Sequence, residues 1–227
     1  MNALFNTLSA SSIMATDESL YMDCSTGAPA WENTSAPMKP LNTVKLAGTP
    51  GVPVTVSLDG DGVFNINGYK TWSGNLDYNG SLELQVFSLK TGLVSVNAYV
   101  TDAPSASVNG SMTFNTYTAG AGVLNRYAIV TGAAADGIMR NSVYIKTDIT
   151  PGVSYARFQI TSSSTARFVG TELPQTANVL LYDDGTASID IINTVAESIT
   201  LTISLPQASG STVIDSCTFV LFPPVKI

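Results

Sequence analysis

The sequence predicts an all-β protein built as an antiparallel β-sandwich. From Thr43 onward, apolar and polar residues alternate over short runs, which is the period of a strand with one buried face. About a dozen such runs follow one another, separated by Gly, Asn, Asp and Pro, as in sandwiches and barrels. Within this strand region, only residues 132–139 have a composition that could form a turn or two of helix. The strand signal therefore has no helical competitor of comparable length.

The first half of the strand region opens with a clear alternation over residues 52–58. There Val52, Val54, Val56 and Leu58 alternate with Pro53, Thr55 and Ser57. Asn67-Gly68 predicts a hairpin turn, because both residue types accept a positive φ angle. Further strands are expected at 81–89, 94–100 and 112–117, with Asn109-Gly110 as another turn.

The second half repeats the pattern. Strands are expected at 126–131, 142–149, 154–161, 167–170, 179–182, 186–193 and 212–222. Asp183-Asp184-Gly185 predicts a hairpin. Between residues 199 and 205, Ile and Leu occupy every second position, which predicts a strand with one apolar face.

The domain organisation has two interpretations. Ala119-Gly120-Ala121-Gly122 is the most linker-like stretch, and it divides the strand region into residues 43–122 and 123–227. The strand count exceeds the seven to nine of an immunoglobulin-type sandwich. We therefore expect either two small sandwiches joined near residue 122, or one continuous jelly-roll-like domain over residues 43–227.

Residues 1–42 are expected to form an extended N-terminal arm. They contain three prolines and no sustained strand period, yet they carry more apolar residues than a disordered tail. These anchors need a surface that covers them, either on the chain's own sandwich or on a neighbouring subunit. The predicted assembly residues are Leu4, Phe5, Ile13, Met14, Leu20, Tyr21 and Trp31.

Charge is sparse throughout the chain. Charged residues make up 12% of the 227 residues, about half the usual share, and the net charge is −7. Low charge is typical of surfaces that pack against other subunits. Without a basic stripe, the chain is not expected to bind nucleic acid. No apolar stretch approaches the ~20 residues of a membrane span, and residues 1–22 lack the basic start of a secretory signal. We expect no membrane partner, and either no export or a leader already removed.

The residue inventory argues against catalysis. The chain has no histidine, which excludes histidine-based nucleophilic devices and histidine-ligated metals. No phosphate-binding glycine loop is present. We expect neither enzymatic activity nor a cofactor, although paired carboxylates of a glycosidase type stay open. Asp59 and Asp61 are either part of a hairpin turn or ligands of a loose Ca²⁺ site.

Two further features have alternative interpretations. Residues 69–78 concentrate aromatic rings among polar side chains, which is typical either of a sugar-binding surface or of core and interface anchors. The candidate ligand-binding residues there are Tyr69, Trp72, Asn75, Asp77 and Tyr78. Cys24 and Cys217 lie near opposite ends of the chain and are either bridged or two small buried residues.

Taken together, the strand pattern, low charge, polar uncharged surface and apolar arm resemble those of bacteriophage and viral virion structural proteins. The resemblance implies a capsid decoration protein, or a tail or fibre component. Such a protein would assemble non-covalently with other copies of itself and with other virion proteins, as a homo-oligomer in virions made in the host cytoplasm. The alternative is a secreted or surface carbohydrate-binding module, a lectin or adhesin, acting outside the cell.

Overall fold

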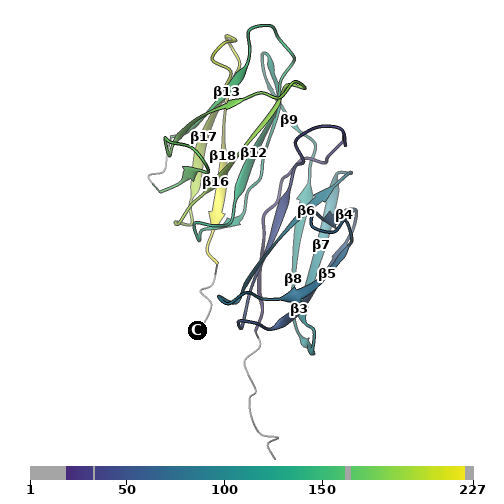
Figure 1. Ribbon diagram of the computed structural model, residues 1–227. Helices are drawn as coiled ribbons and strands as arrows, with labels where there is room; N and C mark the ends of the chain where they lie inside the picture. The colour runs from purple at the N-terminus through teal and green to yellow at the C-terminus, as the bar shows by residue number, and fades with distance from the viewer. Residues whose placement is uncertain (1–18, 33, 162–164, 223–227) are drawn as a thin grey trace, which may run out of the picture.

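A computed structural model describes residues 19–32, 34–161 and 165–222, and it contains two β-sandwiches stacked one above the other (Figure 1). The described residues form strands and turns without a helix, so nothing in these ranges is a helix long and apolar enough to cross a membrane. The expected all-β sandwich architecture is confirmed.

The first sandwich has two four-stranded sheets. One has the strand order β1 (Tyr21–Cys24), β2 (Asn42–Ala47), β6 (Ser81–Ser88) and β4 (Gly62–Phe64). The other has the order β5 (Thr71–Asn75), β3 (Pro53–Asp59), β7 (Gly92–Val100) and β8 (Ala103–Phe114). All neighbours are antiparallel. The two inner faces enclose a core with Phe64 and Phe114 among its largest members.

The second sandwich has two five-stranded sheets. One has the order β14 (Arg167–Phe168), β16 (Thr186–Ile192), β12 (Asn141–Lys146), β10 (Leu124–Ile129) and β9 (Thr118–Ala121). The other has the order β11 (Ala133–Ala134), β18 (Thr212–Val220), β17 (Ser198–Ser204), β13 (Tyr155–Ile160) and β15 (Thr176–Leu180). Only β11 and β18 pair in parallel among the described strands. Membership of the sheets changes between β8 and β9, and residues 119–122 form β9 and its turn into β10.

Glycine positions explain which predicted turns form. Gly68 has a φ of 72° and its N–H donates to the Phe64 carbonyl at 2.8 Å, so a turn forms at Asn67-Gly68. It is not the expected hairpin turn, because the flanking strands β4 and β5 belong to different sheets. The predicted turn at Asn109-Gly110 is wrong, because both residues lie within β8 and pair with β7. A Cβ at Gly110 would stand 2.6 Å from Met22 Sδ. Glycine is therefore placed there by the close approach of β1.

The described part of the expected N-terminal arm folds onto the chain's own first sandwich. Tyr21 lies in β1, which adds an edge strand to β2, and Leu20 packs against the first core. Trp31 meets Phe87 edge-on with 5.6 Å between ring centroids, and the ammonium of Lys39 lies 4.7 Å from the Trp31 ring centroid. The other predicted assembly residues, Leu4, Phe5, Ile13 and Met14, lie outside the described residues.

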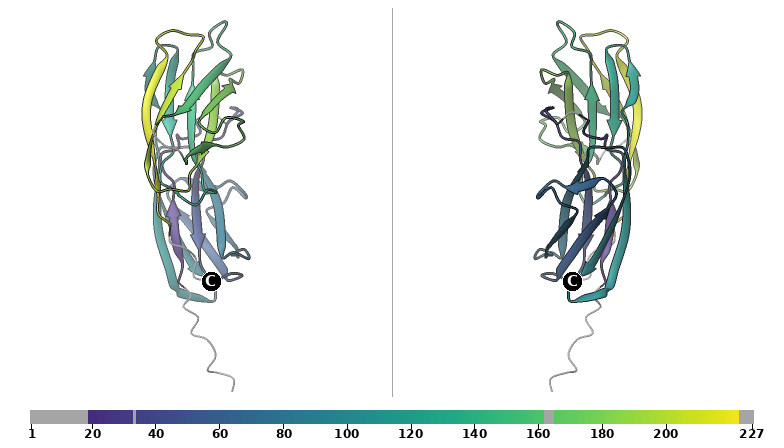
Figure 2. Two further views of the ribbon diagram at one scale, coloured as in Figure 1. Left: turned by 90° about the vertical axis from the view of Figure 1, so that its left-hand side faces the viewer. Right: turned by 90° about the vertical axis from the view of Figure 1, so that its right-hand side faces the viewer.

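The two sandwiches share buried contacts at their junction. Ala128, Val130 and Tyr144 come from the β10 and β12 region of the second sandwich, yet they belong to the core of the first. The Leu41 N–H donates to the Tyr144 hydroxyl at 3.0 Å. Thr26 and Thr131 exchange two backbone hydrogen bonds of 2.8 Å. Two side views show the sandwiches in line along one axis (Figure 2).

The two cysteines are separate free thiols. Cys24 packs against the first core and Cys217 lies within the second. Burial raises the pKa of both thiols to about 12. They are not bridged; Cys217 is a small buried residue, as the second interpretation has it, and Cys24 is partly buried.

Candidate functional site

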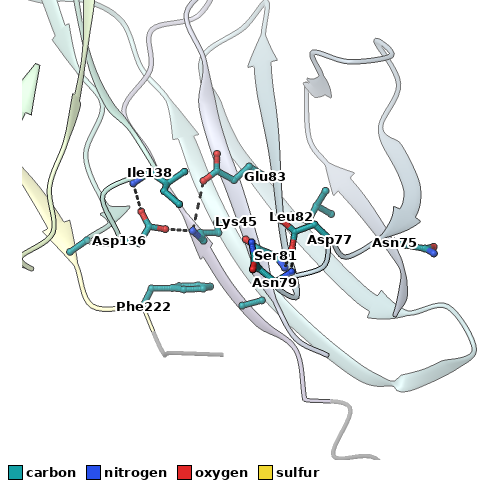
Figure 3. A pocket seen from close by; sticks show the side chains of 12 residues that line it. Lys45, Asn75, Asp77, Asn79, Ser81, Leu82, Glu83, Asp136, Ile138 and Phe222 are labelled. Carbon is teal, nitrogen blue, oxygen red and sulfur yellow. Dashed lines mark hydrogen bonds and ion pairs between the residues drawn. The ribbon is translucent and has the colours of Figure 1, made fainter. Parts of the chain in front are cut away.

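A groove of about 670 Å³ lies between the two sandwiches (Figure 3). Its first wall comes from β2, β6, the end of β5 and the loop between β5 and β6, and its second wall comes from residues 135–138 and Phe222. It is lined by Lys45, Ala47, Asn75, Asp77, Asn79, Ser81, Leu82, Glu83, Ala135, Asp136, Ile138 and Phe222. The groove therefore depends on both sandwiches.

Strand register brings three charged residues together on the first wall. Lys45 on β2 pairs with Asp23 on β1 and with Glu83 on β6, so the three stand side by side across neighbouring strands. Val44 and Leu46 point into the core, because successive side chains of a strand face opposite ways. Lys45 therefore faces outward, toward the second sandwich. Its side chain is nevertheless only 8% exposed, since the junction covers it.

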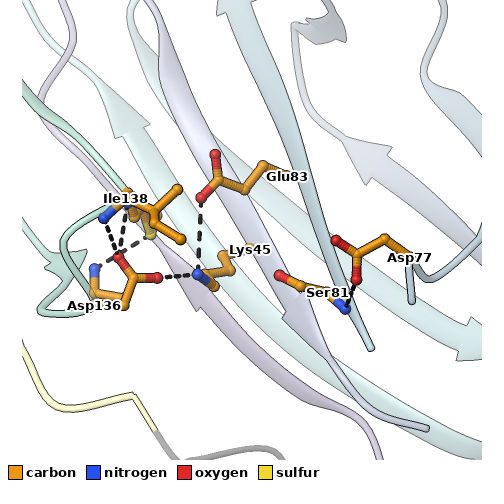
Figure 4. A network of polar contacts seen from close by, with 8 residues as sticks. Lys45, Asp77, Ser81, Glu83, Asp136 and Ile138 are labelled. Carbon is orange, nitrogen blue, oxygen red and sulfur yellow. Dashed lines mark hydrogen bonds and ion pairs between the residues drawn. The ribbon is translucent and has the colours of Figure 1, made fainter. Parts of the chain in front are cut away.

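Asp136 reaches Lys45 from the second sandwich. One carboxylate oxygen, Oδ1, accepts hydrogen bonds of 2.8 Å from the backbone N–H groups of Ile138 and Met139. The other oxygen, Oδ2, makes a direct ion pair with Lys45 Nζ (Figure 4). Glu83 Oε1 lies 3.8 Å from the same Nζ. The backbone bonds thus fix the carboxylate, and the lysine bridges the two sandwiches.

Burial governs the protonation of these acids. Burial raises the pKa of Asp23 to about 6, with a further contribution from the nearby Asp136 charge. Burial also raises the pKa of Glu83, against the opposing pull of Lys45. For Asp136, burial acts upward, but the Lys45 hydrogen bond and two backbone N–H groups prevail and lower the pKa. Within the described part of the chain, Asp23 Oδ2 is buried without a hydrogen-bond partner.

The structure divides the predicted ligand-binding residues between two places. Asn75 and Asp77 line the groove, and Asp77 Oδ1 accepts from the N–H groups of Asn79 and Ser81. The three rings do not line it: Tyr69 is 71% exposed, Tyr78 is 88% exposed, and Trp72 packs against the first core. Sugar binding by these residues stays a prediction.

Sequence reasoning did not identify Lys45, Glu83 or Phe222 as site residues. Lys45 and Asp136 are separated by 91 positions, and no local pattern connects them. One signal was available: Lys45 is a charged residue inside the otherwise apolar run Val44–Ala47. A charge in such a run indicates a partner that covers it.

No metal cluster is present in the described ranges, where no group of three or more Asp, Glu, Cys or His side chains could hold an ion. At the Asp59-Gly60-Asp61 turn, which connects β3 and β4 of the two sheets, Asp59 Oδ1 accepts from the Gly60 N–H at 2.9 Å. Asp61 pairs with Lys90 at 3.5 Å. Both carboxylates therefore have structural roles in the turn.

Comparison with known proteins gives matches only among solved structures. No protein-family model matches the chain, and no curated protein matches its sequence. Invasin, a bacterial integrin-binding protein, matches at 17% identity and a TM-score of 0.35, over 90% of this chain and 40% of that chain. The D0–D1 domain of intimin matches at 16% identity and a TM-score of 0.33, over 88% of this chain and 100% of that chain. Domains 5–6 of the S-layer protein SbsC match at 13% identity and a TM-score of 0.36, over 91% and 98%.

The expected resemblance to virion proteins is wrong. The matched structures are from bacterial adhesin-type and S-layer proteins, and none of these three is a capsid, tail or fibre protein. The virion function and the virion location depended on that resemblance, so these two predictions are wrong as well. The reason for the error is physical: sparse charge and alternating strands describe a packed β-sandwich, and many unrelated functions use sandwiches.

Proposed function

We propose that the chain is an extracellular or cell-surface binding module that takes a neutral carbohydrate in the groove between its sandwiches. The supporting observation is the lining itself. The polar side chains of Asn75, Asn79 and Ser81 line the same groove as the apolar side chains of Ile138 and Phe222. A few polar groups beside apolar surface are the usual composition of a ligand site.

The charges in the groove favour a neutral ligand over an ionic one. Lys45 is already paired with Asp136 and lies near Glu83, so its charge is largely satisfied within the wall. Burial favours the uncharged form of Glu83. Hydroxyl groups of a sugar could hydrogen-bond the exposed amides without displacing any of these ion pairs.

The proposal is tested by isothermal titration with a panel of neutral oligosaccharides. Asn79→Ala should lower affinity roughly tenfold, because one or two hydrogen bonds to a sugar hydroxyl are lost. Tyr182→Ala is the matched control, since Tyr182 is exposed and lines a different groove on the second sandwich. No binding by the wild type, or equal affinity in Asn79→Ala, would refute the proposal.

A further inference from the structure

We propose that Lys45 and Asp136 condense into an intramolecular amide bond, with Glu83 as the proton-transfer group, and that this bond covalently links the two sandwiches. The proposal is independent of the carbohydrate proposal. It rests on the arrangement of one nucleophile, one carboxyl group, two backbone N–H donors and one further acid at a covered junction (Figure 4).

The reacting groups are held together by separate elements. Lys45 Nζ comes from β2 and is in direct contact with Asp136 Oδ2, while its side chain is almost fully buried. Asp136 belongs to the loop after β11, and its own turn fixes the carboxyl group. Holding two reactants in contact makes the step effectively unimolecular, with effective concentrations on the order of 10⁵ M or more in well-oriented cases.

The two oxygens of Asp136 are placed in different roles. Oδ1 accepts hydrogen bonds of 2.8 Å from the N–H groups of Ile138 and Met139. Such a pair of donors stabilises the negative oxygen of a tetrahedral intermediate. Oδ2 is in contact with Lys45 Nζ, which Glu83 Oε1 also approaches, so Oδ2 is the oxygen positioned to leave.

Glu83 completes the proton transfers. Its Oε1 lies 3.8 Å from Lys45 Nζ, and burial favours its protonated form. A proton first passes from the Lys45 ammonium to Asp136 Oδ2, and the free amine then attacks the Asp136 carboxyl carbon. Glu83 donates its proton to the leaving oxygen and accepts one from Nζ. One C–N bond forms, one C–O bond breaks, one water leaves, and Glu83 ends as it began.

The surroundings favour the neutral product. Ala135, Ile138 and Phe222 line the same end of the groove, and the Lys45 ammonium lies 5.6 Å from the Phe222 ring centroid. A buried ion pair carries a desolvation penalty for both charges. Condensation replaces the ammonium and carboxylate by one uncharged amide and so removes that penalty.

The test is the intact mass of the full-length protein under denaturing conditions, followed by peptide mapping. The wild type should weigh one water less than its sequence, and digestion should give one branched peptide that joins residues 45 and 136. Lys45→Arg keeps the charge but should show the full mass. Glu83→Gln keeps both reacting groups and should also show the full mass, or reach the lighter mass far more slowly.

Two controls make the result decisive. Lys90→Ala removes the exposed partner of Asp61 and should leave the water loss unchanged. Asp136 precedes Gly137, and an Asp-Gly pair can also lose water by closing on its own backbone. If the lighter mass persists in Lys45→Arg, that closure is the cause and the proposal is wrong. A wild type of full mass would overturn it as well.

Discussion

Truncation of Tyr144 should uncouple the two sandwiches. The residue is in β12 of the second sandwich, but its ring is 5% exposed and packs in the first core. An aromatic side chain buries roughly 150–250 Å², which at about 25 cal/mol per Å² corresponds to about 4–6 kcal/mol. Large-to-small substitutions of buried aromatic residues lose about 3–5 kcal/mol, and we expect this range for Tyr144→Ala.

Tyr144→Phe isolates the contribution of the hydroxyl group. It keeps the ring but removes the acceptor of the Leu41 N–H, which should lower the free energy of unfolding by about 1–3 kcal/mol. The Ala variant should therefore be less stable than the Phe variant by about 2 kcal/mol. That difference measures the packing of the ring in the first core.

The assay uses the position of the tryptophans. Trp72 packs against the first core, whereas Trp31 also lies beside Lys146 and Thr186 of the second sandwich. In a Trp31→Phe background, the Trp72 fluorescence therefore reports on the first sandwich, whereas circular dichroism reports on both. In urea, the two signals should change together in the wild type, as in a two-state transition. In Tyr144→Ala, the fluorescence transition should occur at a lower urea concentration than the circular dichroism transition. Coincident transitions in that variant, or equal stability of the Ala and Phe variants, would refute the reasoning.

Two further predictions concern backbone strain and pH. Gly80 and Gly68 have nearly the same φ, 71° and 72°, but a Cβ at Gly80 would stand 2.0 Å from the Gly48 carbonyl oxygen, and nothing lies within 4 Å at Gly68. Gly68→Ala should lower the free energy of unfolding by about 1 kcal/mol, and Gly80→Ala should lower it clearly more. Thermal unfolding measures both losses, and equal losses would contradict the prediction. The pKa of Asp23 is about 6 in the folded state, against an ordinary 3.8. At a pH between these two values, native Asp23 therefore keeps a proton that the unfolded chain has lost. Its contribution to stability should fall as pH rises from about 4 to about 6 and stay lost above. Asp23→Asn should remove that part of the pH dependence; parallel profiles of stability against pH for the wild type and the variant would count against the prediction.

The sequence predicts strands better than it predicts contacts between them. Ile199, Leu201 and Ile203 alternate in sequence and are all buried on one face of β17, because a strand's period is local. Asn109-Gly110 has the composition of a turn, but the reason for Gly110 is the close approach of β1, far away in sequence. Local patterns cannot show a constraint of that kind.

The candidate site was predictable only in part, for the same reason. Asn75 and Asp77 were identified because they lie in a polar and aromatic segment, and the structure places both at the groove. Lys45, Glu83 and Asp136 come from a strand, its neighbour and a distant loop. Their contact depends on how two sandwiches meet, which no spacing in the sequence encodes.

The shared core also has a consequence for folding during synthesis. The strands of the first sandwich are complete once Phe114 has been made, but its core still lacks Tyr144, thirty positions later. At about 5–20 residues per second, the ribosome adds that stretch in about 2–6 seconds. During this interval the first sandwich has all its strands and an open end. The nascent chain therefore leaves apolar surface uncovered until β12 emerges, which is a window in which chaperones would bind it.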